Sequence, residues 1–384
     1  MIYLDNAATT FPKPDCVYRE IDRCMREYCA NPGRGGHSMS IEAGKAVTEA
    51  RDVVCEFFNI KNPMQMSFTK NTTEALNIAI KGCLKTGDHV ITTCMEHNSV
   101  MRPLKTLERD AGIQLTILNG NELGEIEPDK VKDSIKSNTK LIVCTLSSNV
   151  NGIIMPIDEI GTIAREAGVM FLLDAAQGAG SIPVDIEAQN IDMLAFPGHK
   201  GLLGPQGTGG LFVREGIKLK SLMEGGTGSN SENTYQPDIM PDLLESGTLN
   251  TPGIIGLYNG IKYIRCRSLE EIGNYKYTLI NRLIEGIKDI EGIILYSVCE
   301  KRRNSGIAAI NLDGCDSTEM SYILDKDYGI ATRAGLHCAP CAHKTLGTGK
   351  TGIVRFSVGC FNTIEEIDIT IDAVKQISKK FNIS

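Results

Sequence analysis

Lys200 and Asp174 each combine a chemically versatile side chain with a position at the end of an apolar run. Asp174 follows the run 169–173, and Lys200 follows the run 191–196 inside the turn Gly-His-Lys-Gly. A carboxylate at a buried strand end should have a cationic or donor partner. Partial desolvation of a lysine lowers its pKa and makes the amine nucleophilic. The alternatives are a helix N-cap for Asp174 and a solvated surface lysine for Lys200.

A second pattern, Asn71-Thr-Thr-Glu74, follows a predicted strand and opens a predicted helix. Unpaired backbone N–H groups and the positive dipole end of a helix suit a phosphate, and the hydroxyls of Thr72 and Thr73 add donors. An ordinary N-cap explains the same pattern. Together with Asp174 and Lys200, however, it supplies the three needs of pyridoxal phosphate (PLP). These are a Schiff-base lysine, an anion for the pyridinium nitrogen and a phosphate cup.

The third pattern, at 331–343, concentrates potential ligands and nucleophiles: His337, Cys338, Cys341 and His343. Zinc accepts such ligands, but structural zinc sites usually draw ligand pairs from separated segments, so we expect no metal. A dithiol redox pair stays an alternative, although the segment does not predict a thioredoxin-like helix. The favoured interpretation is a nucleophilic Cys338 on a polar, mobile loop, where Arg333 and His337 favour the thiolate.

The elements that position these residues alternate along the chain. Apolar runs predict strands at 64–68, 89–94, 141–146, 169–173, 191–196 and 209–213, and amphipathic stretches predict helices near 41–58, 72–85, 99–111, 128–136 and 157–167. This rhythm is typical of a mainly parallel sheet covered by helices, with ligands bound beyond the carboxyl ends of the strands. We expect long loops at 214–256, and then a second α+β domain over 257–384 with strands at 306–312 and 353–357.

Composition sets limits on the protein class. The 384 residues are 42% hydrophobic and 23% charged, which excludes a disordered chain, and the net charge of -7 argues against broad binding to nucleic acid or anionic membrane. No apolar run is long enough to span a membrane, and the first residues are no signal peptide. We therefore expect a cytoplasmic protein whose 13 cysteines are reduced. The eleven cysteines other than Cys338 and Cys341 are expected to act mostly as small hydrophobes.

These segments, in this order, resemble the cysteine desulfurases, PLP enzymes of the class V aminotransferase-like group. The resemblance runs from Tyr-Leu-Asp-Asn-Ala-Ala at 3–8 to Cys-Phe-Asn-Thr-Ile-Glu-Glu at 360–366. The segment Arg-Ala-Gly-Leu-His-Cys-Ala-Pro at 333–340 is similar to the form in desulfurases that include selenocysteine lyases. The resemblance implies the α/β fold of PLP-dependent transferases (fold type I). A large domain over 15–256 would hold a mainly parallel, seven-stranded sheet, and residues 1–14 and 257–384 would form a smaller α+β domain.

The resemblance also implies a role for each matching residue. Lys200 would form the Schiff base with PLP, and Cys338 would take the sulfur. The implied cofactor contacts are Asp174 at the pyridinium nitrogen, Gln177 at the phenolic oxygen, His97 on the ring, Thr72, Thr73 and His199 at the phosphate, and Thr248 at the phosphate of the other subunit of a homodimer. The implied substrate contacts are Asn149, Arg333 and Arg355, with Arg34 and His37 near the entrance.

The implied reaction converts L-cysteine to L-alanine and leaves a persulfide on Cys338, from which a sulfur-acceptor protein would take the sulfur. L-selenocysteine is the alternative substrate, and an aminotransferase or β-lyase is the alternative enzyme. A metal- or redox-regulated scaffold that uses the residues 338–343 is the non-enzymatic alternative.

Three departures from the family pattern concern the site. Pro197 stands where a phosphate-binding serine is common, so one hydroxyl contact is lost. Leu336 replaces a frequent histidine before His337 and puts a proton relay there in doubt. The stretch 341–351 is long and adds Cys341, which would shield, resolve or relay a persulfide, or have no role.

Overall fold

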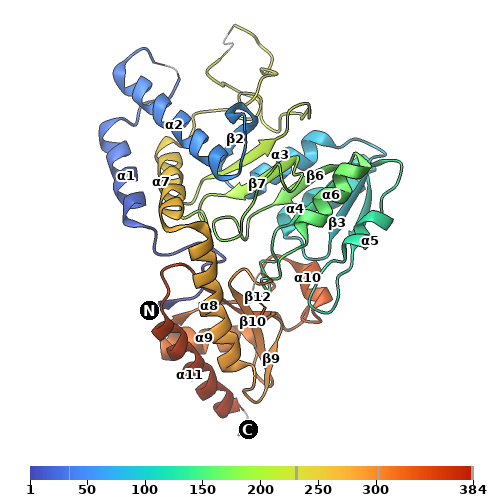
Figure 1. Ribbon diagram of the computed structural model, residues 1–384, viewed down its shortest axis with the longest axis vertical. Helices are drawn as coiled ribbons and strands as arrows, with labels where there is room; N and C mark the ends of the chain where they lie inside the picture. The colour runs from blue at the N-terminus through green and yellow to red at the C-terminus, as the bar shows by residue number, and fades with distance from the viewer. Residues whose placement is uncertain (34, 230–231, 301–302, 382–384) are drawn as a thin grey trace.

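A seven-stranded sheet forms the centre of the larger part of the molecule (Figure 1). The computed structural model describes residues 1–33, 35–229, 232–300 and 303–381. The strand order is β2-β8-β7-β6-β5-β3-β4. In chain order the strands are β2 (Met66–Thr69), β3 (His89–Thr93), β4 (Gln114–Leu118), β5 (Thr139–Thr145), β6 (Met170–Asp174), β7 (Met193–Pro197) and β8 (Gly209–Val213). Since only β8 runs antiparallel to its neighbours in this sheet, the predicted mainly parallel sheet is confirmed.

Helices cover both faces of this sheet. They are α1 (Asp15–Glu27), α2 (Ser38–Phe57), α3 (Thr72–Cys83), α4 (Asn98–Ala111), α5 (Pro128–Asp133), α6 (Ile157–Ala167) and α7 (Thr251–Arg267), and the 3-10 turn η1 (Pro63–Gln65) precedes β2. Successive residues of β6 point to opposite faces, and accordingly Phe171 belongs to one hydrophobic cluster and Leu172 to another. The cluster of Phe171 includes residues of α2 and α6, and that of Leu172 includes residues of α3 and α4.

The predicted elements are confirmed with shifts at their ends, and two elements of this part were missed. Strand β4 lies at the sheet edge and is half-exposed over most of its length, so it lacks an apolar run. Helix α1 has only two buried residues, Val17 and Cys24. The predicted loop at 214–256 ends early, because Asn250 caps α7 through the Gly253 N–H, at 3.2 Å.

The remaining residues build a smaller layered part. The antiparallel sheet β12-β13-β10-β9 consists of β9 (Ile293–Leu295), β10 (Ile307–Leu312), β12 (Arg333–Gly335) and β13 (Ile353–Ser357). It packs with α8 (Leu269–Ile287), α9 (Ser317–Tyr328) and α11 (Ile364–Phe381) around a separate apolar cluster, and α10 (Pro340–Thr345) lies beside it. Strand β1 (Ile2–Tyr3) pairs with β11 (Ile330–Ala331). The boundary expected after residue 256 falls inside α7 and stays a prediction.

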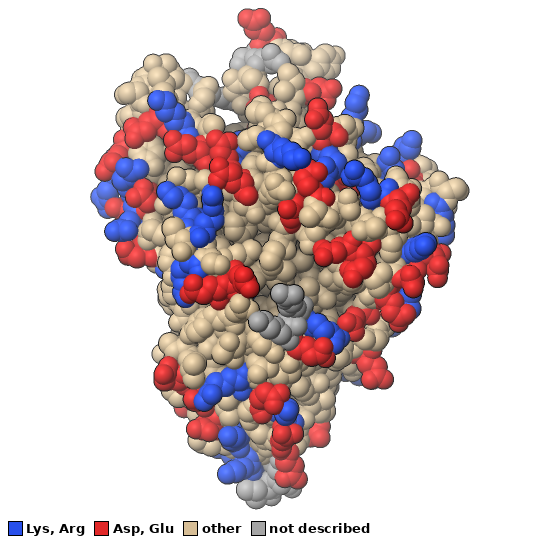
Figure 2. Space-filling view, viewed as in Figure 1, with Lys and Arg blue, Asp and Glu red and all other residues tan. Residues whose placement is uncertain are grey.

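Positive and negative side chains are interspersed on the face seen in Figure 2. Over the part of the chain that the structure describes, no helix has both the length and the apolar character needed to cross a bilayer.

A buried ion pair attaches the segment before α7 to the large sheet. Both terminal guanidinium nitrogens of Arg51, on α2, donate to the Glu245 carboxylate, at 2.7 and 2.9 Å. The same carboxylate accepts from the Phe68 N–H at 2.6 Å, and the guanidinium lies over the Phe68 ring. Glu245 therefore fixes the position of the segment that also carries Thr248.

We predict that Glu245→Ala lowers the free energy of unfolding by about 3–5 kcal/mol, because Arg51 would stay buried without its counter-charge. Urea denaturation followed by circular dichroism measures the change. The control is Glu127→Ala, which removes the partner of Lys130 in an exposed ion pair and should cost less than about 1 kcal/mol. Equal effects of the two substitutions would contradict the importance of the buried pair.

Candidate active site

The carboxyl ends of β6 and β7 bring Asp174 and Lys200 to one cavity. Asp174 is the last residue of β6 and pairs with Ala195 of β7, and Lys200 follows β7 by three residues. The Asp174 carboxylate accepts from the Ala176 N–H at 2.9 Å. Burial raises the pKa of Asp174 to about 6, and this N–H and Lys200 oppose the shift. Burial lowers the pKa of Lys200 to about 8, against the attraction of Asp174.

The start of α3 combines an ordinary cap with unused hydroxyl groups. Asn71 accepts from the Glu74 N–H at 2.9 Å, and Glu74 accepts from the Lys70 N–H at 2.6 Å, so the capping interpretation holds for these two side chains. Thr72 and Thr73 are not used in this cap. The Thr72 hydroxyl is buried without a partner among the described residues. A buried orphan donor at a helix start is satisfied by an anion such as a phosphate.

Two neutral histidines line the same cavity. The His97 Nδ1 accepts from the Ser99 N–H at 3.1 Å, and His199 Nδ1 lies 3.1 Å from the Thr9 hydroxyl. Burial, followed by the positive charge of Lys200, lowers the pKa of each ring to about 4. Ser99 was missed in the sequence, although it stands two residues after His97. Its hydroxyl lies 2.8 Å from that of Thr73 and 2.9 Å from His97 Nδ1, so it couples the ring to the helix start.

Most of the predicted cofactor residues share this cavity. Its lining includes Thr72, Thr73, His97, Asn149, Asp174, Gln177, His199 and Lys200, together with the unexpected Pro197. Thr248 is exposed and lines a different depression, next to Glu245. His37 is exposed at the N-cap of α2, and Arg34 lies outside the described residues. The fold of one chain therefore does not bring Thr248 or His37 to Lys200.

Arg355 lies on β13, opposite Arg333 on β12. Its side chain is buried and forms an ion pair with Asp5 at 2.7 Å. Another of its nitrogens donates to the Asn149 carbonyl at 2.7 Å, while its Nε has no partner among the described residues. The role of Asp5 was missed in the sequence, although this residue lies in the segment at 3–8.

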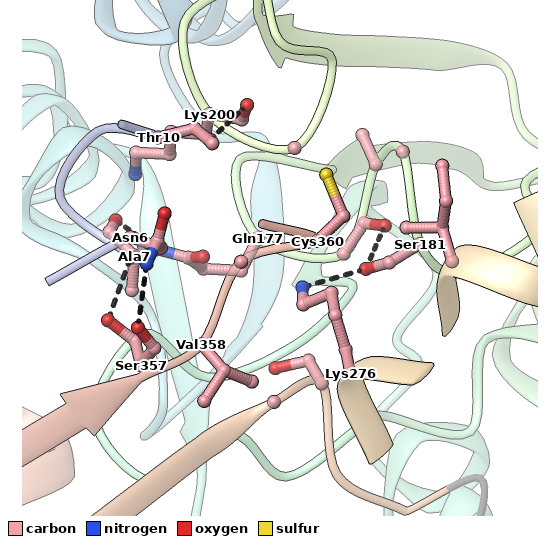
Figure 3. A pocket seen from close by; sticks show the side chains of 18 of the residues that line it. Asn6, Ala7, Thr10, Gln177, Ser181, Lys200, Lys276, Ser357, Val358 and Cys360 are labelled. Atoms are coloured by element: carbon pink, nitrogen blue, oxygen red, sulfur yellow. Dashed lines mark hydrogen bonds between the residues drawn. The ribbon is translucent and has the colours of Figure 1, made fainter. Parts of the chain in front are cut away.

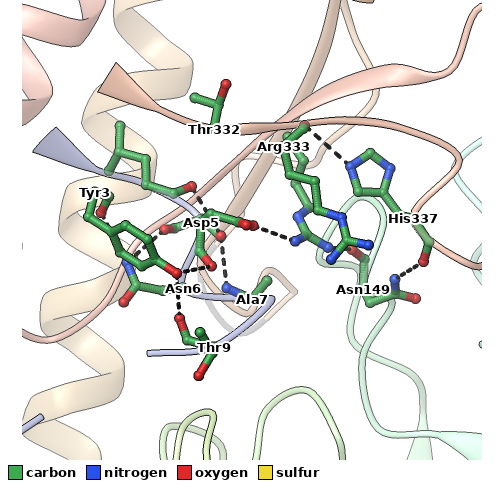
Figure 4. Close-up of polar contacts among 12 residues, drawn as sticks. Tyr3, Asp5, Asn6, Ala7, Thr9, Asn149, Thr332, Arg333 and His337 are labelled. Carbon is green, nitrogen blue, oxygen red and sulfur yellow. Dashed lines mark hydrogen bonds and ion pairs between the residues drawn. The ribbon is translucent and has the colours of Figure 1, made fainter. Parts of the chain in front are cut away.

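Cys338 stands at an exposed reverse turn. The Ala339 N–H donates to the Leu336 carbonyl at 2.9 Å, and the two central residues, His337 and Cys338, have φ of 48° and 56°. This left-handed conformation costs side-chain-bearing residues about 1–2 kcal/mol each. Hydrogen bonds oppose that cost: Asn149 donates to the His337 carbonyl at 2.7 Å (Figure 4), and the Asn98 N–H donates to the Cys338 carbonyl at 2.8 Å.

A short helix, α10, begins just after the turn, because Pro340 has the backbone angle of a first helical position. One expectation for this segment is wrong. His337 is no source of positive charge for Cys338. Burial, followed by the charge of Arg355, lowers the pKa of His337 to about 3. Its ring stacks on buried His343 with centroids 5.7 Å apart, and His343 Nδ1 lies 2.8 Å from the Thr348 hydroxyl.

The structure also bears on the metal and thiol expectations. Among the residues whose positions are described, no group of three or more His, Cys, Asp and Glu side chains is arranged to hold a metal ion. All 13 cysteines are free. Of the eleven expected to act as small hydrophobes, five are buried, but Cys29 and Cys266 are exposed, so the description holds for only part of the set.

The residues present fit PLP. The cavity combines a desolvated amine, a buried carboxylate, neutral aromatic rings and the orphaned hydroxyl of Thr72, which are the chemical groups that this cofactor requires.

Comparison with known proteins agrees with this chemistry. The family model of the class-V aminotransferases matches residues 2–370. A probable cysteine desulfurase of Methanothermobacter thermautotrophicus is 36% identical over 98% of this chain and 94% of its own length. A cysteine desulfurase of Serratia proteamaculans is 31% identical over 99% of this chain and 94% of its own. The apo structure of a cysteine desulfurase from Thermococcus onnurineus superposes with a TM-score of 0.93 at 33% identity, covering 99% of this chain and 95% of the other.

We predict that, in protein stripped of any cofactor, acylation of Lys200 by a small anhydride rises with pH around a midpoint near 8. Below that pH the amine becomes protonated and unreactive. Since Asp174 raises the pKa of Lys200, Asp174→Asn should move the midpoint to lower pH. Peptide mass spectrometry measures the labelling, with exposed Lys262 as the internal control. A midpoint for Lys200 equal to that of Lys262 would contradict the desolvation.

Proposed function

The chain belongs to the class V aminotransferase family and to its cysteine desulfurases, and we propose that it uses Lys200 and Cys338 to convert L-cysteine to L-alanine and to retain the sulfur as a persulfide. One observation carries the assignment of these residues. A desolvated amine lines a cavity, and an exposed thiol stands on a turn hydrogen-bonded to Asn149, which lines the same cavity.

We assign the cavity to PLP. Asp174 would hold the pyridinium nitrogen, Gln177 the phenolic oxygen, and His97 the face of the ring. Thr72, Thr73 and His199 would bind the phosphate. The Thr72 hydroxyl, which is buried without a partner among the described residues, supports this assignment. When bound, PLP supplies an electron sink for the carbanion at the substrate Cα.

Lys200 serves as the base that removes the Cα proton. A pKa near 8 gives its amine a sizeable neutral fraction close to physiological pH, whereas an ordinary lysine is almost entirely protonated there. Asp174 keeps this pKa from falling further, and it stays mostly ionised at pH 7 because its own pKa is about 6. Asp174 thus supplies a negative charge beside the Lys200 amine, which can take up or release a proton.

Cys338 serves as the sulfur acceptor. Its thiolate attacks the substrate sulfur, so that a sulfur–sulfur bond forms as the carbon–sulfur bond of cysteine breaks. The electron pair of that bond stays on the substrate carbon, which takes a proton, and the products are L-alanine and a Cys338 persulfide. Because the Cys338 side chain is exposed, a sulfur-acceptor protein can approach it.

Arg355, Arg333 and Asn149 are assigned to the substrate carboxylate. Arg355 is the best placed of the three, because its guanidinium is buried and its Nε has no partner among the described residues. Asp5 neutralises part of the charge of Arg355, so the buried guanidinium has a counter-charge before substrate binds.

We further propose that the enzyme works as a homodimer, in which Thr248 and His37 complete the cavity of the second subunit. Both side chains are exposed in one chain and lie away from its Lys200 cavity. Cytoplasmic location likewise stays a prediction.

We predict that Lys200→Ala abolishes the visible absorbance of the purified enzyme and lowers alanine formation from L-cysteine at least about a thousandfold, since both the covalent attachment and the base are lost. Absorbance spectra and an alanine assay measure this. Lys262→Ala, on an exposed position of α7, is the control and should retain both properties. Native turnover by Lys200→Ala would exclude Lys200 as the base.

We predict that Cys338→Ala keeps the absorbance of the holoenzyme but loses desulfuration, because the sulfur acceptor is missing while the cofactor site is intact. In the native enzyme, intact-mass analysis after incubation with L-cysteine should show the gain of one sulfur atom, mapped to Cys338. Cys341→Ala is the control and should still gain it. Sulfur mapped to Cys341, or an active Cys338→Ala enzyme, would overturn the assignment.

A further inference from the structure

A second cavity lies between the large sheet and the smaller part of the molecule, apart from the active-site chemistry. It opens among the loop 177–181 that follows β6, the turn 305–307 that leads into β10, the segment 357–360 after β13, and α8 (Figure 3). Ile272 and Lys276, one helical turn apart on α8, contribute side chains from the same helix face. Of the residues that the structure describes, Gln177 and Lys200 line both this cavity and the active-site cavity.

Among the described residues, the lining of this cavity contains no carboxylate. It includes the side chains of Lys200 and Lys276, the Cys360 thiol and four hydroxyls. Three of these hydroxyls donate to backbone carbonyls: Thr10 to Lys200, Ser181 to Gly178 and Ser357 to Leu4. Burial raises the pKa of Cys360, so this thiol is neutral at pH 7. The balance of charge in the lining is therefore positive.

Lys276 supplies a cation whose acidic neighbour among the described residues is the weakly acidic Cys360 thiol. Its ammonium group donates to the Ser181 hydroxyl at 3.1 Å (Figure 3), and no described carboxylate lies within ion-pair distance of it. Burial lowers the pKa of Lys276 to about 8, so at pH 7 the group is still mostly charged. A desolvated ammonium with one hydrogen bond has unused donors.

The backbone is shaped to admit this side chain. Gly306 has φ of 100°, a left-handed value that disfavours side chains, and a Cβ there would lie 2.9 Å from Lys276 Cε. On the other side, Gly273 lets α8 approach the loop, since a Cβ there would lie 2.5 Å from the Ser181 carbonyl. Two glycines thus make the room in which Lys276 reaches Ser181.

We propose that this cavity binds a small monovalent inorganic anion, such as chloride or hydrosulfide, at the Lys276 ammonium. Its volume of about 40 Å³ exceeds the ~10–15 Å³ needed for one water, so it has room for a small anion. The anion compensates the buried ammonium and connects α8 to the loop after Gln177, so it stabilises the packing of the smaller part against the large sheet.

The test uses the holoenzyme and needs no turnover. At constant ionic strength, replacing gluconate by bromide at about ten times the dissociation constant should raise the unfolding midpoint by about 2 °C. Lys276→Met should lose this increase, whatever its own midpoint. Lys288→Met is the matched control, because Lys288 follows α8 directly and has an exposed ion pair with Glu285. It should keep the increase.

Crystals soaked in bromide give the second measurement. An anomalous peak within hydrogen-bonding distance of Lys276 Nζ, absent in Lys276→Met, supports the site. No peak there, or an equal midpoint increase in Lys276→Met, overturns it. Parallel titrations with chloride and with hydrosulfide, under anaerobic conditions, distinguish the two anions. The one that raises the unfolding midpoint at the lower concentration is the better ligand. An enzyme that fails to desulfurate cysteine could still pass this test, so the two proposals stand independently.

Discussion

The structure depends on holding an amine and a carboxylate out of water at neighbouring strand ends. Burial disfavours the charged form of each group: it raises the pKa of Asp174 and lowers that of Lys200. Each charge opposes the shift of the other, and so both groups stay mostly ionised at pH 7. The parallel sheet makes this possible, because β6 and β7 end at the same edge and their apolar residues remove water from beneath the pair.

The Cys338 thiol, in contrast, must be accessible to solvent, because the sulfur that it accepts has to leave the enzyme. Cys338 is exposed, and its backbone has a conformation that side chains disfavour. Such strain persists only where the surroundings compensate for it. The compensation comes from Asn98 and Asn149, which bond the turn carbonyls from the large part of the molecule, and from the buried stack of His337 on His343. Asn149 also lines the amine's cavity, which joins the two halves of the site.

Elements and residues whose signal is local could be predicted from the sequence. The buried strands are apolar runs, Asp174 stands directly after one of them, and Lys200 follows another within a few residues. Both the sheet and the edge that carries the reactive side chains were therefore predictable. The half-exposed β4 lacks such a run. The neutrality of His337 was not predictable, because it arises from burial against Arg355, which is close only in the fold. The exposure of Cys29 and the separation of Thr248 from Lys200 are likewise tertiary properties.

The N-terminal segment shows how far tertiary contacts control the site. Asp5 pairs with Arg355, which lies 350 positions away, and Ala7 accepts from the Gln177 side chain at 2.8 Å. The Thr10 N–H donates to the His199 carbonyl at 3.1 Å, and the Thr10 hydroxyl donates to the Lys200 carbonyl at 2.5 Å. The six residues from Asp5 to Thr10 thus connect the arginine assigned to the substrate with the turn that carries the catalytic lysine. Because these contacts use backbone carbonyls as well as side chains, a shift of the smaller part would move the Lys200 turn and the Arg355 guanidinium together. The distance between the base and the carboxylate site is therefore set by this short segment.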